Sequence, residues 1–141
     1  MNTFNSLVAA ILAAVSFNTF AAEWKMVSSS ADEQVFVDTH SLIKKKDNLI
    51  QVRILENFAR PNSMGHGLYD HKSRYLVVAV DCSAGQMTYQ QWSMHAEALG
   101  TGATVWADSM QGGPAFFRPD LNSGYGRVVG NVCHSPVAMK D

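Results

Sequence analysis

The chain has 141 residues, a formal net charge of −1 and a pI near 6.5, which argues against a nucleic-acid-binding protein with a basic face. Hydrophobic residues make up 47% of the sequence and charged residues 16%, so length and composition favour one globular domain.

Residues 1–22 have the features of a secretory signal peptide. Their apolar stretch, residues 7–15, is too short to cross a bilayer as a helix, and Ala21 and Ala22 favour cleavage after either position. The alternative is an N-terminal helix of the mature fold, which is disfavoured because the stretch has no polar face. We therefore expect a mature domain of residues 23–141, exported through the inner membrane to the periplasm, the medium or the cell surface.

The first half of the mature chain predicts three strands. Residues 23–27 and 35–38 are predicted as strands on either side of a polar turn. A charged turn, Lys44-Lys45-Lys46, then leads into a longer strand over residues 49–58. In that third strand one face is apolar and the other is polar, which is typical of an antiparallel sheet with one solvated side. The apolar face carries Ile50, Val52, Ile54 and Phe58, and the polar face carries Gln51, Arg53 and Asn57.

A loop rich in Gly and Pro is predicted from Arg60 to about Lys72, followed by three more strands. Residues 74–82 are apolar on both faces over most of their length, so this strand is expected at the centre of the sheet. Residues 86–95 and 103–107 complete the set. In the first of these, a one-residue bulge near Gln90 and Gln91 would bring four large side chains to one face. Those side chains are Met87, Tyr89, Trp92 and Met94.

A C-terminal helix is predicted from apolar residues spaced at three and one, with its N-cap at Asn122 or Ser123. The apolar positions are Tyr125, Val128, Val129, Val132 and Cys133. Three glycines make the helix weak by propensity, and they would also let it lie close to the sheet. In an oxidising compartment a Cys82–Cys133 disulfide is the default expectation. Two free buried thiols, or half of a metal site, are the alternatives that the sequence leaves open.

The order and spacing of four segments resemble the surface-adhesin protein E-like family of bacterial exported proteins. The segments are residues 37–44, 49–55, 72–82 and 128–133, the last two of which end in the two cysteines. The resemblance implies a six-stranded antiparallel sheet with one C-terminal helix tethered to it by the disulfide. It also implies adhesion to host extracellular proteins and, in some relatives, haem binding. No cysteine lies near the cleavage point, so we expect no lipid anchor and no membrane span after signal cleavage.

No nucleophile elbow, phosphate loop or metal-binding helix motif is present, so we expect no enzyme, no catalytic residue and no bound cofactor. His66 and His71 lie close together in one loop and form the candidate ligand loop for haem or a metal. An ordinary polar loop is the favoured interpretation, because a helix or strand would fix two ligands better than a loop flanked by glycine. The tryptophans with Phe116 and Phe117 predict either an exposed aromatic platform or part of the core.

The sequence therefore predicts an α+β domain with an antiparallel sheet of about six strands and one helix packed on it. The favoured function is a non-enzymatic binding module that contacts a host extracellular protein or an envelope protein through the open face or an edge of the sheet. A periplasmic haem- or metal-binding protein is the alternative, and a homodimer stays open as its oligomeric state.

Overall fold

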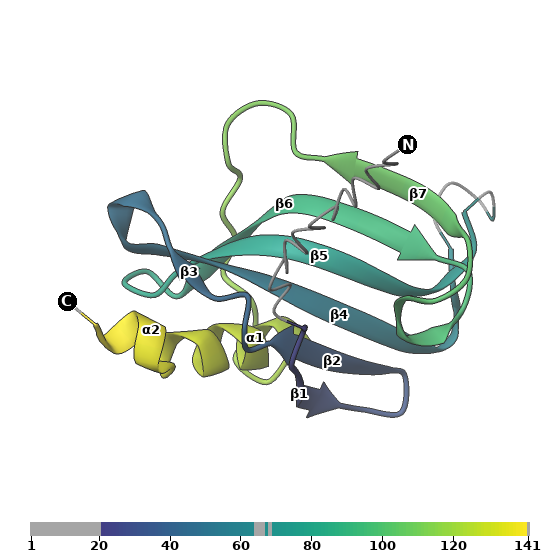
Figure 1. The fold of residues 1–141 in the computed structure, drawn as a ribbon, viewed down its shortest axis with the longest axis horizontal. Helices are drawn as coiled ribbons and strands as arrows, with labels where there is room; N and C mark the ends of the chain where they lie inside the picture. Colours follow the sequence, from purple (N-terminus) through teal and green to yellow (C-terminus); the bar gives the residue numbers. More distant parts are fainter. Residues whose placement is uncertain (1–20, 64–66, 68, 141) are drawn as a thin grey trace, which may run out of the picture.

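The computed structural model describes residues 21–63, 67 and 69–140, and it forms one antiparallel sheet with a helical segment on one face (Figure 1). The strand order is β1-β2-β4-β5-β6-β7, with the short β3 pairing β4 beside β2. The strands are β1 (Trp24–Ser29), β2 (Glu33–Asp38), β3 (Ile43–Lys44), β4 (Leu49–Asn62), β5 (His71–Asp81), β6 (Gln86–His95) and β7 (Thr104–Ser109). The helices are α1 (Gly124–Cys133) and α2 (Pro136–Met139).

The expected α+β architecture is confirmed, including the central place of the most apolar strand. β5 lies between β4 and β6, and its residues Leu76, Val78 and Val80 are almost fully buried on the face that α1 covers. We call this side the inner face and the opposite side the open face. The inner-face core continues into β2, β4, β6 and α1 through Val35, Val37, Ile50, Val52, Ile54, Met87, Val128, Val129 and Val132.

Two local features differ from the sequence-based expectation. The sheet has seven strands rather than six, because Ile43 and Lys44 pair with Gln51 and Ile50, and Lys44 was expected in a charged turn. β4 extends to Asn62 through the region predicted as a loop, and its pairing with β5 is irregular between Asn57 and Asn62. Pro61 fits this segment because a bulged or edge position does not need its missing N–H.

The predicted bulge in the fifth predicted strand, β6, is confirmed. Val77 pairs with Gln91 but Val78 pairs with Tyr89, so one extra residue, Gln90, is inserted in β6. Because of this shift, Tyr89 and Trp92 both pack against the inner-face core despite their opposite parity in the sequence.

The segment after β7 returns to the same edge of β6. Met87 and Phe117 exchange two backbone hydrogen bonds of 2.9 Å, so Phe117 continues the pairing that β7 makes farther along β6. From there the chain reaches α1, whose N-cap is Ser123: its side chain accepts a hydrogen bond from the Gly126 N–H.

Two glycines allow α1 to approach its neighbours closely. A Cβ atom on Gly124 would lie 2.8 Å from a methyl carbon of Val35 on β2, and one on Gly126 would lie 2.0 Å from the carbonyl oxygen of Asp120. The expectation that glycine lets the helix lie close to the sheet is therefore confirmed at Gly124, whereas Gly126 lets the helix pack against the segment that leads into it. Gly130 differs, because a Cβ atom there would meet nothing within 4 Å.

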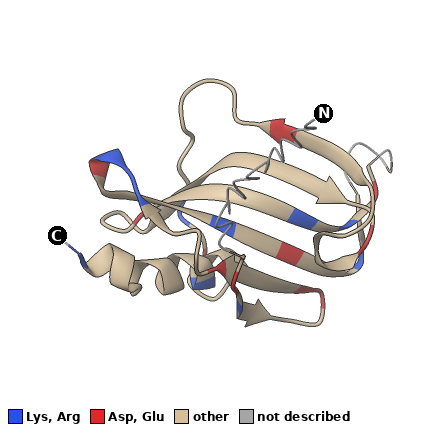
Figure 2. Cartoon of the chain, viewed as in Figure 1, with Lys and Arg blue, Asp and Glu red and all other residues tan. Residues whose placement is uncertain are grey.

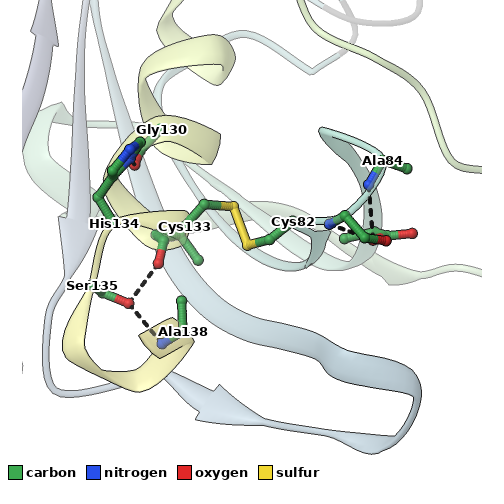
Figure 3. The surroundings of a disulfide bond; sticks show 10 residues. Cys82, Ala84, Gly130, Cys133, His134, Ser135 and Ala138 are labelled. Atoms are coloured by element: carbon green, nitrogen blue, oxygen red, sulfur yellow. Dashed lines mark hydrogen bonds between the residues drawn. A yellow bond between two sulfur atoms is a disulfide. The ribbon is translucent and has the colours of Figure 1, made fainter. Parts of the chain in front are cut away.

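The Cys82–Cys133 disulfide joins the residue after β5 to the last residue of α1 (Figure 3). The two Cα atoms are 5.5 Å apart, and the cysteines are separated by 51 positions in the sequence. Next to it, the Ser135 side chain bonds to the Val132 carbonyl and accepts from the Ala138 N–H, which starts α2. The disulfide thus fixes the C-terminal end of α1 to the centre of the sheet.

Replacing both cysteines with serine is expected to lower the free energy of unfolding by about 4 kcal/mol, because the cross-link closes a loop of this length in the unfolded chain. Urea denaturation followed by circular dichroism measures the change, and wild-type protein treated with a reductant serves as a matched control. An unchanged urea midpoint in the double variant would contradict a stabilising role for the disulfide.

Candidate functional site

The open face carries a row of cationic and aromatic side chains that we call the open-face strip: Trp24, Arg53, Tyr75 and His95. The Arg53 guanidinium carbon lies 5.5 Å from the Trp24 ring centroid and 5.7 Å from that of Tyr75. The Trp24 and Tyr75 rings are stacked at 5.7 Å, and His95 meets Tyr75 edge-on at 5.2 Å. These contacts are within the range of cation–π and aromatic pairing, so the four side chains hold one another in place.

Strand register brings this row together from β1, β4, β5 and β6. Trp24 pairs with Asp38 at the end of β2, and the Asp38 carboxylate lies 3.9 Å from Arg53 Nε on β4. Asp38 is almost completely buried and also accepts hydrogen bonds from the backbone N–H groups of Glu23 and His40. The buried carboxylate is therefore a fixed anchor for the half-exposed Arg53.

The loop after β6 supports the other end of the strip. Gly100 lies so close to Tyr75 that a Cβ atom there would be 2.2 Å from the tyrosine hydroxyl oxygen. The buried Ser73 hydroxyl donates to the Glu97 carbonyl and accepts from the Gly100 N–H, which attaches the loop to β5. This packing restricts the Tyr75 ring without covering it fully, since Tyr75 keeps intermediate exposure.

A shallow groove of about 290 Å³ continues from the strip toward β7. The groove is lined by Arg53 and Tyr75 together with residues of β6 and β7, so the open face has a depression beside the open-face strip. The groove residues are Arg53, Tyr75, Leu76, Val77, Gln91, Trp92, Ser93, Ala107, Asp108 and Ser109.

His95 ends the strip and contacts a hydroxyl group. Burial lowers the pKa of His95 below its usual range, because it disfavours the charged ring. The Ser93 Oγ lies 2.9 Å from Nε2 of His95. Among the described residues, no carboxylate forms an ion pair with this ring, so the contact lacks the orienting acid of a Ser–His–Asp triad.

The inner face contains a buried polar cluster of Glu56, Arg74 and Tyr125. Glu56 is 2% exposed and forms an ion pair with Arg74 from the neighbouring strand, and Arg74 also donates to the Tyr125 hydroxyl at 2.9 Å. Burial alone would disfavour the charged Arg74, but the hydrogen bond and charge of Glu56 outweigh it and raise its pKa. Burial and the Glu56 charge also raise the pKa of Tyr125. The cluster links α1 to the sheet through three satisfied polar groups.

Beside this cluster the inner face has an apolar groove of about 320 Å³ that α1 does not fill. Tyr69, from the segment before β5, packs on Trp106 at 4.8 Å at one end of it. The groove is lined by Arg74, Leu76, Tyr89, Trp92, Met94, Trp106 and Asp108. The aromatic residues that the sequence predicted as either a platform or part of the core are thus divided: Trp24 lies on the open face, whereas Trp92 and Phe117 pack against the inner-face core and Trp106 lines the inner-face groove.

The candidate ligand loop stays a prediction. His66 lies outside the described residues, and His71 is a buried residue at the start of β5 whose Nδ1 is 2.8 Å from the Tyr69 carbonyl oxygen. Its ring meets Phe58 edge-on at 5.6 Å. Within the part of the chain that the structure describes, no three His, Cys, Asp or Glu side chains are close enough together to hold a metal ion.

Comparison with known protein families identifies the family of this chain. The family model described as surface-adhesin protein E matches residues 24–134, which include every strand and all of α1. The chain belongs to the surface-adhesin protein E family. No curated protein and no solved structure gives a match.

Membership of the surface-adhesin protein E family confirms the resemblance that the four sequence segments carry. It identifies the chain as an adhesin-like protein and supports a role in binding rather than catalysis. Among the residues described, none of the helices is both long and apolar enough to cross a membrane. The predicted signal peptide, residues 1–22, falls almost entirely outside the described residues and stays a prediction.

Replacing Arg74 with methionine is expected to destabilise the fold by about 3 kcal/mol, because it leaves the buried Glu56 carboxylate without its cation. Urea unfolding at pH 7 measures this loss. A double variant, Glu56→Leu with Arg74→Met, should recover most of the stability, and Arg60→Met at an exposed position is the matched control. Equal stability of Arg74→Met and the control would show that the ion pair is unimportant.

Replacing Glu33 with glutamine is expected to stabilise the protein at neutral pH. Burial and the nearby Glu56 charge raise the pKa of Glu33 above its ordinary value of 4.5. The folded protein therefore binds this proton more tightly than the unfolded chain, so stability falls as pH rises from 4.5 through the higher folded pKa. Thermal unfolding from pH 3 to pH 7 should show the advantage of Glu33→Gln growing with pH, and a constant difference would count against this explanation.

Proposed function

We propose that this surface-adhesin protein E family member is an exported, non-enzymatic protein-binding module whose partner contacts the open-face strip. The partner class is a host extracellular protein or an envelope protein. Export follows from the predicted signal peptide, and a disulfide is the usual feature of a protein that folds in an oxidising compartment.

The observation that carries the proposal is the open-face strip itself. Tryptophan, tyrosine and arginine are the residues most enriched among those that dominate the binding energy of protein interfaces. Here one of each is held in mutual contact on a sheet face that no helix of the described residues covers.

Pre-organisation strengthens the argument. The buried Asp38 carboxylate forms an ion pair with Arg53, and the Gly100 loop packs against Tyr75. Arg53 and Tyr75 therefore have little conformational freedom left to lose on binding. The depression beside the strip gives a partner side chain a place to insert, and the surrounding polar residues of β6 and β7 form a solvated rim.

Removing the strip side chains is expected to weaken partner binding without unfolding the protein. Arg53→Ala and Tyr75→Ala should each raise the dissociation constant by roughly 30-fold, the effect of losing an interface residue worth about 2 kcal/mol. Surface plasmon resonance against a panel of purified extracellular-matrix proteins and solubilised envelope proteins measures this. Arg60→Ala is the matched control, because Arg60 is exposed and lies away from the strip.

Two outcomes would overturn the proposal. The first is a partner that binds the strip variants and the wild type equally well, with circular dichroism showing all of them folded. The second is full protection of the native protein from protease on intact cells combined with no binding to any envelope protein.

A further inference from the structure

A groove of about 870 Å³ lies between strand β1 and helix α1, and none of the four open-face strip residues lines it. In Figure 1, β1 is the edge strand of the sheet, and α1 lies beside that edge. We call it the edge groove. Its lining residues are Lys25, Met26, Val27, Thr39, Leu42, Leu121, Gly126, Arg127, Gly130, Asn131, His134, Ser135, Pro136 and Val137.

One wall of the edge groove is an unpaired strand edge. Within the described ranges β1 pairs with β2 alone, so it ends the sheet, and its outward N–H and C=O groups have no neighbouring strand. An edge of this kind is a template for an added strand, because the free backbone groups can continue the ladder of hydrogen bonds.

The charge of the edge groove has one sign. Lys25 and Arg127 line it, and none of the lining residues is Asp or Glu. Helices α1 and α2, with the residues up to Lys140, also contain no acidic residue, and Figure 2 shows no acidic colour along them. In a chain with a net charge of −1 this is a local excess of positive charge, so the groove favours an anionic occupant.

Gly130 gives the groove its depth at the middle of α1. A glycine inside a helix lowers helix stability by about 1 kcal/mol relative to alanine. At Gly124 and Gly126 close neighbours leave no room for a Cβ atom, but at Gly130 no neighbour requires glycine. Gly130 lines the edge groove, where a Cβ atom would project into open space. Leu121, which is 80% exposed, and Met26 add apolar surface on either side.

We infer that the edge groove binds an acidic, extended polypeptide segment, which adds as a strand beside β1 and directs alternate Asp or Glu side chains toward Lys25 and Arg127. Alternate side chains of a strand point to the same side at about 6.6 Å spacing, so a segment of alternating acidic and apolar residues fits the charge and shape of the groove. This site lies outside the open-face strip and does not depend on it.

The test uses a fluorescein-labelled peptide of alternating glutamate and valine, with alternating lysine and valine as the control peptide. Fluorescence anisotropy at low salt should show saturable binding of the acidic peptide only. Lys25→Glu with Arg127→Glu should weaken binding by at least about tenfold, since reversal replaces attraction by repulsion. The matched control, Lys72→Glu with Arg118→Glu, reverses exposed charges that do not line the groove and should leave binding unchanged.

A second variant tests the shape of the groove independently of its charge. Gly130→Leu should keep the fold, because its Cβ position is open, and should block the peptide by filling the groove. Circular dichroism confirms folding. Unchanged peptide affinity in folded Gly130→Leu would overturn the assignment of the site to this groove.

Two further experiments identify the class of ligand and test whether the edge groove acts independently of the open-face strip. A peptide N-methylated at alternate residues should lose binding, because it cannot continue the β1 ladder. Equal binding of the N-methylated peptide, or of heparin fragments through the same residues, would replace strand addition by simple attraction of polyanions and so overturn the proposal. Tyr75→Ala should retain the acidic peptide, which separates failure of this site from failure of the open-face strip.

Discussion

The attachment of α1 to the sheet is the constraint on which the rest of the structure depends. α1 contains three glycines and three valines, so its intrinsic helix propensity is low and packing must hold it. The Cys82–Cys133 bond fixes its C-terminal end, Val128 and Val132 fill the inner-face core, and Tyr125 joins the Glu56–Arg74 pair. The helix in turn keeps the most apolar part of the sheet from solvent, which a domain of this size needs.

Because α1 covers one side of the sheet, the two faces differ in burial and composition. The inner face buries a continuous set of branched apolar residues, whereas the open face keeps Arg53 and Tyr75 partly accessible on top of a smaller apolar layer. Leu55 and Ala79 belong to that layer: both are buried, yet neither belongs to the main core cluster. Arg53 and Tyr75 are therefore held in place by their neighbours on the open face. The edge groove lies on another part of the surface, between β1 and α1.

Much of the fold could be predicted from the sequence because local patterns determine it. Alternation in residues 49–58 assigned Arg53 to the solvated face, the apolar run before Cys82 placed β5 at the centre, and the positions of Met87, Tyr89, Trp92 and Met94 required the bulge that the structure contains. The disulfide followed from two cysteines and an expected oxidising compartment, although free thiols and a metal site were open alternatives.

The candidate sites could not be predicted in the same way, because they depend on register between distant strands. Trp24 and Tyr75 are 51 positions apart, and nothing in either local pattern indicates that Arg53 lies against both rings. Glu56 interrupted an apolar face in the sequence, and only the pairing of β4 with β5 shows that Arg74 neutralises it. The two-residue β3 is too short to give a periodic signal at all.

The inserted residue of β6 has a consequence for how this chain tolerates change in length. Gln90 lets the two halves of the strand present large side chains to the same side, and the same strand must satisfy β5 on one flank and both β7 and Phe117 on the other. Deleting one residue here would straighten the ladder but rotate one half of the strand by half a turn, moving Met87 and Tyr89 out of the interior. Relatives with this architecture are therefore expected to vary in length in the turns that join the strands, while β6 keeps a constant number of residues.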